Sequence, residues 1–192
     1  MEKYACVKTA DQLVGKLCIH VRKLTYSAVC LAMALALPFL TGQIPEIGSM
    51  LCPMHIPVLL CGVLCGWPWG LAVGFTAPLL RSILFGMPPM FPTGIAMAFE
   101  LAAYGAVAGA MYRWTPKKSV FVYGTLITAM AAGRLVWGAV QYALAGLQGT
   151  VFTASAFVAG AVTMAIPGIV LQLVMIPPLV IMLQKTRLIL NG

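Results

Sequence analysis

The sequence carries very little charge, and acidic residues are its scarcest class. Only 4 of the 192 residues are Asp or Glu, and charged residues of both signs make up 8% of the chain. Hydrophobic residues account for 61%, and the mean hydropathy is +0.98. Because so little polar material cannot cover a globular surface, the composition excludes an ordinary soluble domain and predicts an integral membrane protein.

Several motifs of energy coupling and catalysis are also missing. The chain has no GxxxxGK[ST] loop, so it does not couple ATP hydrolysis to movement by itself. It has no HExxH motif, no GxSxG motif and no paired aspartates in an apolar segment, which argues against most intramembrane hydrolases. No inverted repeat relates the two halves, which disfavours a secondary transporter of that design. We therefore expect neither an enzyme nor a cofactor.

The basic residues and the cysteines do not form patterns typical of nucleic acid or metal binding. The 12 Lys and Arg residues give a net charge of +8. They flank apolar segments and do not alternate with aromatic residues in a soluble block, so no nucleic acid partner is expected. The 6 cysteines lack zinc-site spacing, and only Cys61 and Cys65 share a helix face. We expect no metal site and interpret the cysteines as small packing residues.

Long apolar runs delimited by Pro, Gly or charged residues predict an all-α membrane protein with six transmembrane helices. A barrel is excluded because the runs are too long and lack period-two alternation. The sequence GWPWG at 66–70 predicts a tight turn between two spans, and its tryptophans suit a membrane interface. The expected spans are 24–41, 52–66, 68–86, 92–113, 119–146 and 155–184.

The positions of the basic residues predict the orientation of these spans. Residues 1–23 are mixed and basic and do not resemble a cleavable signal, so we expect a cytoplasmic segment followed by one membrane domain at 24–192. Six spans with both termini in the cytoplasm place ten of the 12 bases on the cytoplasmic side, in agreement with the positive-inside rule. These ten are Lys3, Lys8, Lys16, Arg22, Lys23, Arg113, Lys117, Lys118, Lys185 and Arg187.

Three charged residues lie inside apolar stretches: Arg81, Glu100 and Arg134. A charge at membrane depth is costly unless a partner compensates it, so these residues are candidates for function. At about 1.5 Å per helical residue, they lie roughly 8, 12 and 18 Å from the outer ends of their spans. His55 lies at a similar or shallower level. We therefore expect four helices to converge on one polar cavity that faces outward.

Helical spacing adds aromatic and amide side chains to this expected site. Trp137 and Gln141 follow Arg134 at i+3 and i+7. Tyr104 shares a helix face with Glu100. Guanidinium groups suit a carboxylate or phosphate, whereas a carboxylate and an amide suit hydroxyls or amides. The pattern predicts a small, polar and anionic organic solute.

Other interpretations of the same residues remain open. Arg81 is close enough to the outer surface to snorkel towards it. Glu100 and Arg134 are also compatible with a buried structural ion pair, which does not exclude a ligand at its edge. His55 by itself is compatible with an interfacial histidine that has its own partners.

Two further patterns bear on transport. The segments 41–53 and 86–94 are rich in Pro and Gly, so neither is expected to continue a helix, and both are candidate gates over the outer mouth of the cavity. Ala28, Ala32 and Ala36 recur every four residues along the first span. Small residues at this spacing allow close approach of another helix, in a partner or within the chain itself.

With these features the chain resembles the substrate-binding S components of energy-coupling factor (ECF) vitamin transporters. The resemblance rests on the size, the six spans, the AxxxAxxxA face and the capped outer cavity, and it covers nearly the whole chain. Residues 50–112 are especially similar to a bacterial subgroup that is often assigned to pantothenate or left without a substrate.

The resemblance implies a protein of the bacterial plasma membrane that binds a vitamin or precursor from outside. It further implies association with a transmembrane coupling subunit and two ATPases, and a toppling motion that releases the solute inward. The three alanines match the coupling face of the family. Ligand residues diverge within the family, so none is carried over; the paired arginines favour pantothenate or another anionic vitamin. The alternatives are a solitary secondary transporter and, less favoured, an intramembrane enzyme that uses Glu100 and His55.

Overall fold

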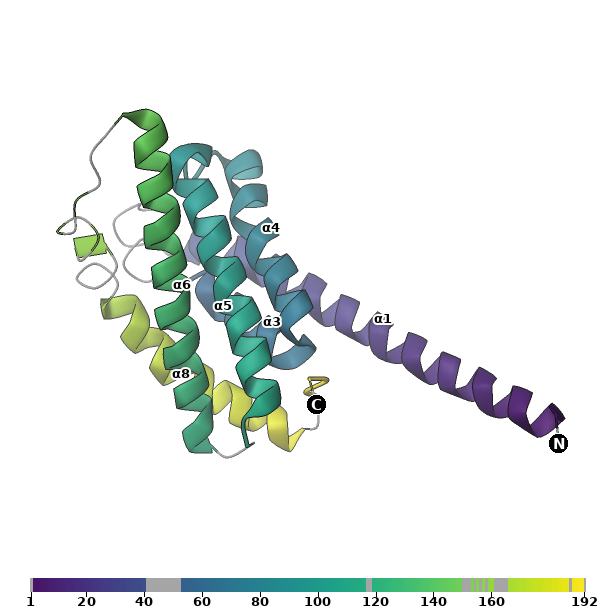
Figure 1. The fold of residues 1–192 in the computed structure, drawn as a ribbon. Coiled ribbons are helices and arrows are strands. Elements are labelled where there is room, and N and C mark those ends of the chain that lie inside the picture. Colours follow the sequence, from purple (N-terminus) through teal and green to yellow (C-terminus); the bar gives the residue numbers. More distant parts are fainter. Residues whose placement is uncertain are drawn as a thin grey trace.

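The protein is described by a computed structural model covering residues 2–40, 53–116, 119–149, 153, 155, 157, 159–160, 166–186 and 188–191, with side chains from residue 14 onward except at 40 and 119. Within these residues the regular structure is entirely helical. Figure 1 shows α4, α5 and α6 in one bundle, with α3 behind them, α8 along one side and α1 leaving obliquely. The elements are α1 (Glu2–Leu40), α3 (His55–Cys65), α4 (Trp67–Phe85), the π-helical turn η1 (Met90–Gly94), α5 (Ile95–Trp114), α6 (Ser119–Gln148) and α8 (Ile166–Lys185).

Five helical segments of the described chain are long and apolar enough to cross a membrane. They are Val14–Phe39, Trp67–Phe85, Met90–Trp114, Val120–Gln148 and Ile166–Lys185. Five of the six predicted spans fall on them. The last predicted span begins at 155, whereas α8 begins at Ile166; residues 161–165 between them lie outside the described part of the chain.

The predicted span 52–66 contains only the short helix α3. Its 11 residues extend about 16 Å, roughly half of the hydrocarbon thickness of a bilayer. The helix ends because Gly66 has φ 101°, in the left-handed region that glycine adopts without steric cost. The predicted turn at 66–70 is therefore wrong in its extent, since α4 already begins at Trp67. Every residue of α3 is buried, so it is an interior helix enclosed by longer ones.

Glycines spaced four residues apart bring α3, α4 and α5 into close contact. A Cβ atom on Gly70 or Gly105 would collide with the backbone of the other residue. A Cβ atom on Gly109 would lie 2.8 Å from the carbonyl oxygen of Gly62. Small residues at this spacing allow helix backbones to approach until van der Waals contact is continuous. The packing fixes the position of α5, which carries two of the predicted site residues.

The segment 86–94 folds back on the end of α4. Ser82 Oγ donates a hydrogen bond of 2.7 Å to the carbonyl oxygen of Pro88. The segment does not continue α4, which ends at Phe85; its second half forms η1, in which Phe91 has the non-helical angles φ −122° and ψ 131°. The other predicted gate, 41–53, lies outside the described residues except for Pro53.

The C-terminal residues pack into the opposite end of the bundle. The backbone amide of Leu190 donates to the carbonyl oxygen of Leu64 at 2.8 Å. Asn191, which is 5% exposed, donates from Nδ2 to the carbonyl oxygen of Gly109 at 2.8 Å. The tail therefore ties the end of α3 to α5.

Candidate functional site

A buried ion pair joins α5 to α6. Glu100 Oε1 lies 3.0 Å from Arg134 Nη1, and the two side chains are 3% and 16% exposed. The desolvation of two such charges is compensated only by close mutual pairing and by further polar contacts. The structure thus brings together two of the three charges that the sequence places at membrane depth.

Helix α3 adds a histidine to this pair. His55 Nε2 lies 3.6 Å from Glu100 Oε1, and the His55 ring meets the Tyr104 ring edge-on at a centroid distance of 4.9 Å. Within the described part of the chain, neither ring nitrogen of His55 makes a hydrogen bond, although the residue is 1% exposed. A buried polar group without a partner costs about 1–3 kcal/mol. We call His55, Glu100, Tyr104 and Arg134 the α3–α5–α6 cluster.

A glycine on α6 sets the position of the tyrosine. A Cβ atom on Gly133 would lie 2.7 Å from Cε1 of Tyr104, so the missing side chain makes room for the phenol ring. The ring, 1% exposed, then reaches His55 on the other side. The sequence analysis did not single out Gly133, although a glycine directly before a charged residue in an apolar helix was a usable signal.

Arg81 occupies a different place from the cluster. Its Nη1 donates a hydrogen bond of 3.0 Å to the carbonyl oxygen of Leu35 on α1. Its guanidinium carbon lies 5.3 Å from the ring centroid of Phe39 and 5.6 Å from that of Phe85, a cation–π arrangement. Pro38, which has no N–H to donate to the carbonyl oxygen of Ala34, lies in the same turn of α1.

The burial of Arg81 bears on whether its side chain snorkels to the outer surface or lies inside the protein. The side chain is 4% exposed, so its guanidinium does not snorkel to the bundle surface. Among the described residues, the hydrogen bond and cation–π contacts of Arg81 go to α1 and α4, not to the α3–α5–α6 cluster. The structure therefore does not bring all three buried charges into one group.

The remaining predicted residues lie farther along α6. Trp137 stacks on Phe157 at a centroid distance of 6.3 Å and an interplanar angle of 28°. Gln141 is half-buried one turn beyond it. Gln172 on α8 is 2% exposed and was missed, although a lone amide in the apolar run IVLQLVMIPP was a visible signal.

The three alanines of α1 lie on its exposed side. Ala28, Ala32 and Ala36 are all exposed, whereas Cys30 and Ala34 on the other side of the helix are buried in the core that includes α3. Within the described part of the chain, the alanines are therefore not an internal packing face. They are free to meet another protein or lipid.

The chemistry of the cluster is that of recognition by hydrogen bonds and charge. Arg134 supplies a planar donor group, Glu100 an acceptor, and His55 one donor and one acceptor when neutral. Across the described residues, no three of His, Cys, Asp and Glu gather in a way that would hold a metal ion.

One known protein family matches most of the chain. A family model described as "ECF transporter, substrate-specific component" matches residues 22–180, from α1 to α8. No curated protein and no solved structure matches the chain. The family match agrees with the five apolar helices of a multi-pass membrane protein. Members of this family are subunits of transporters and not enzymes. The chain belongs to the family of substrate-specific components of ECF transporters.

Proposed function

We propose that the protein binds a small anionic vitamin at the α3–α5–α6 cluster and delivers it inward with a transmembrane coupling subunit and two ATPases. One observation carries this proposal: the buried pair of Glu100 and Arg134 adjoins a histidine whose ring nitrogens make no hydrogen bond in the described chain. A purely structural ion pair does not require such a neighbour. A bound ligand would supply the missing partners.

Arg134 is the proposed principal cation of the site. Its side chain is 16% exposed, against 3% for the side chain of Glu100. The forked donor geometry can hold a carboxylate of the protein and one of the ligand together. Pantothenate has one carboxylate with hydroxyl and amide groups, which Glu100, His55 and Gln141 would meet. Other carboxylated or phosphorylated vitamins fit the same donors.

The aromatic and cationic neighbours have secondary roles in this proposal. Tyr104 and Trp137 form apolar walls that exclude water from the polar contacts. Arg81 would contact the same ligand only if its guanidinium left the Leu35 carbonyl. We therefore assign it a contribution only in a rearranged, ligand-bound state.

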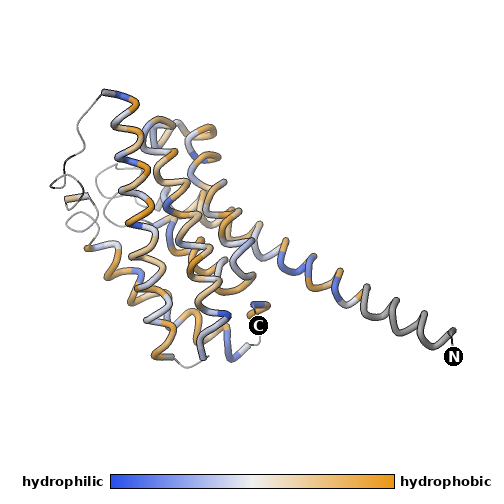
Figure 2. The backbone as a smooth tube through the Cα atoms, in the orientation of Figure 1, coloured by the Kyte–Doolittle hydropathy of each residue, from blue (hydrophilic) through white to orange (hydrophobic). Residues whose placement is uncertain are grey.

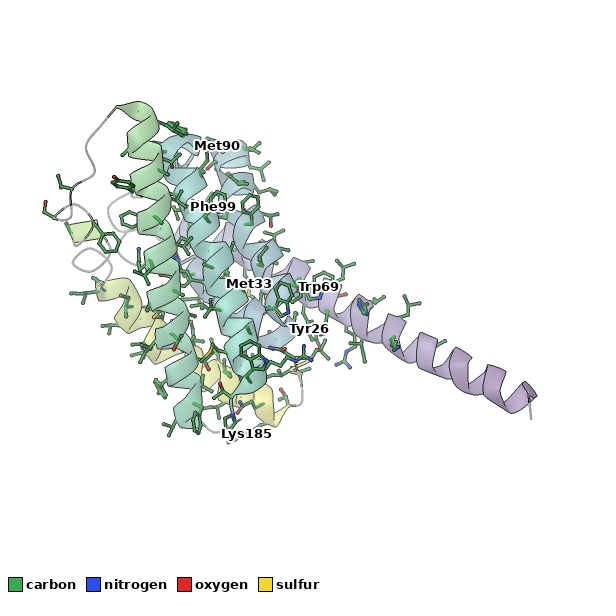
Figure 3. All side chains as sticks on the ribbon, in the orientation of Figure 1. Tyr26, Met33, Trp69, Met90, Phe99 and Lys185 are labelled. Carbon is green, nitrogen blue, oxygen red and sulfur yellow. The ribbon has the colours of Figure 1, made fainter. Side chains whose placement is uncertain are left out.

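We also propose that the chain crosses a bacterial plasma membrane six times, with both termini and the segment 1–23 in the cytoplasm. In this topology the segment 52–66, which contains α3, makes the second crossing. Arg113 and Lys185 lie in the last turns of α5 and α8, which the positive-inside rule assigns to the cytoplasmic side. Met90 belongs to the proposed outer gate 86–94. Figure 3 shows Lys185 at the opposite end of the bundle from Met90.

The coupling role of the alanine face leads to a direct prediction. Replacing Ala28, Ala32 or Ala36 with Leu should lower vitamin uptake by proteoliposomes at least tenfold, because a larger side chain prevents close helix approach. A tenfold loss corresponds to about 1.4 kcal/mol of complex stability, within the usual cost of overpacking. Vitamin binding to the isolated protein should stay unchanged.

The matched control is Ala143→Leu, at an alanine of α6 that is also exposed. It should retain uptake. Equal loss of binding and uptake in the α1 variants would reject the coupling role. Uptake driven by an ion gradient without coupling subunit and ATPases would instead identify a solitary secondary transporter.

A further inference from the structure

Helix α1 is longer than a membrane crossing requires. Its 39 residues extend about 58 Å, whereas about 20 residues cross the hydrocarbon core. The end of α3 marks where the bundle ends along α1, because Cys65 Sγ lies 3.6 Å from the carbonyl oxygen of Lys23. The part of α1 before Lys23 therefore extends past the bundle, as Figure 1 shows.

The extending segment has one apolar and one basic face. Val14, Leu17, Val21 and Leu24 recur at helical spacing and are 66%, 66%, 53% and 58% exposed. The other side carries Lys16, Arg22 and Lys23, with Ile19 as its one large apolar residue. No acidic residue occurs between 14 and 40. Figure 2 shows hydrophilic and hydrophobic positions alternating along this part of α1.

This combination fits the surface of a membrane better than water. An apolar face of four large side chains is unfavourable in water, and several bases in ten residues are unfavourable in hydrocarbon. A basic amphipathic helix satisfies both faces at the boundary, with apolar side chains among acyl chains and bases near lipid phosphates. The lack of acidic side chains makes the segment complementary to an anionic surface.

The course of α1 agrees with a position at that boundary. The helix runs obliquely to the bundle in Figure 1, and its N-terminal part stands clear of the other helices. Trp67 and Trp114, which are 49% and 79% exposed, lie at the ends of α4 and α5. Exposed tryptophans are typical of the membrane–water interface. Figure 3 places Tyr26 and Trp69 close to where α1 leaves the bundle.

We infer that residues 14–23 form an amphipathic interfacial helix that docks on the anionic lipid headgroups of the membrane face from which α1 leaves the bundle. The apolar side of this segment continues into the alanine face, since Val21, Leu24 and Ala28 share one side of the helix. Docking on lipid therefore sets the rotation of α1 about its axis and the direction of the alanine face. The inference requires membrane insertion but not the proposed ligand site.

Spin labels on the full chain in nanodiscs test this location. Labels are attached singly to Leu17→Cys and Val21→Cys on the apolar side, and to Gly15→Cys and Ile19→Cys on the basic side, with other reactive cysteines replaced by Ser. The lipid is phosphatidylcholine with or without phosphatidylglycerol. The ratio of collisions with oxygen to collisions with a water-soluble nickel chelate should be several-fold higher at the apolar positions. Phosphatidylglycerol should increase the difference.

Removal of charge tests the lipid contact. The double variant Lys16→Gln/Arg22→Gln should lose the effect of phosphatidylglycerol, whereas Lys185→Gln, at an exposed base of α8, should keep it. Equal access of the nickel chelate to all four labels in both bilayers would overturn the inference and place the segment in water. Shielding of the apolar positions only after addition of the coupling subunit would also overturn it, in favour of a protein partner.

Discussion

Replacing Arg134 with Gln is expected to lower the affinity for pantothenate at least a hundredfold and to destabilise the fold. The variant leaves the Glu100 carboxylate, which is 3% exposed, without its cation. Removing one partner of a buried pair costs about 3–5 kcal/mol, and a hundredfold loss of affinity corresponds to about 2.7 kcal/mol. Thermal unfolding in detergent and titration calorimetry measure the two effects separately.

The double variant Glu100→Gln/Arg134→Gln separates a binding role from a structural one. It removes both charges together, so the stability should return close to that of the wild type, while binding stays lost. Arg113→Gln, at an exposed arginine of α5, is the control and should change neither property. Wild-type affinity in the double variant would show that the pair is only structural.

The second large effect is expected for Gly105→Ala. The added methyl group would collide with the backbone of Gly70, and neither helix can retreat without breaking the contact of α5 with α3 and α4. Overpacking of this kind costs about 1–3 kcal/mol and more where only backbone can move. The protein should melt at clearly lower temperature, and ligand affinity should fall because α5 carries Glu100 and Tyr104.

Gly124→Ala on α6 is the matched control for that substitution. Nothing lies within 4 Å of a Cβ atom placed there, and alanine favours a helix over glycine by up to about 1 kcal/mol. Its melting temperature should equal or exceed that of the wild type. If the melting temperature of Gly105→Ala equals that of Gly124→Ala, the close approach of α4 and α5 does not contribute to stability.

The sequence allowed much of the architecture and part of the candidate cluster to be predicted. Hydropathy locates the long helices because a run of about 20 consecutive apolar residues is typical of a helix that crosses a membrane. The constant rise of a helix allowed the depths of Glu100 and Arg134 to be compared, and the structure places these two residues 3.0 Å apart. Tyr104 followed from helical spacing alone. These predictions needed only local geometry.

The errors concern contacts between helices and local backbone conformation. The depth of Arg81 did not reveal its neighbour, which is a backbone carbonyl of α1 near Pro38. The span predicted at 52–66 ends at Gly66, where the positive φ ends α3, but the helix itself begins only at His55. Glycines at 62, 70 and 74 were visible in the sequence, but their partners on α5 depend on how the helices pack.

A thermal-shift screen against the B vitamins, with wild type and Glu100→Gln/Arg134→Gln in parallel, tests the central claim most directly. A ligand at a hundred times its Kd stabilises the native state by about 2.7 kcal/mol, which raises the Tm of a protein of this size by roughly 5–10 °C. We predict that a carboxylate-bearing vitamin, pantothenate first, raises the Tm of the wild type and not that of the double variant. An equal rise in both proteins would contradict the assignment of the α3–α5–α6 cluster as the vitamin site.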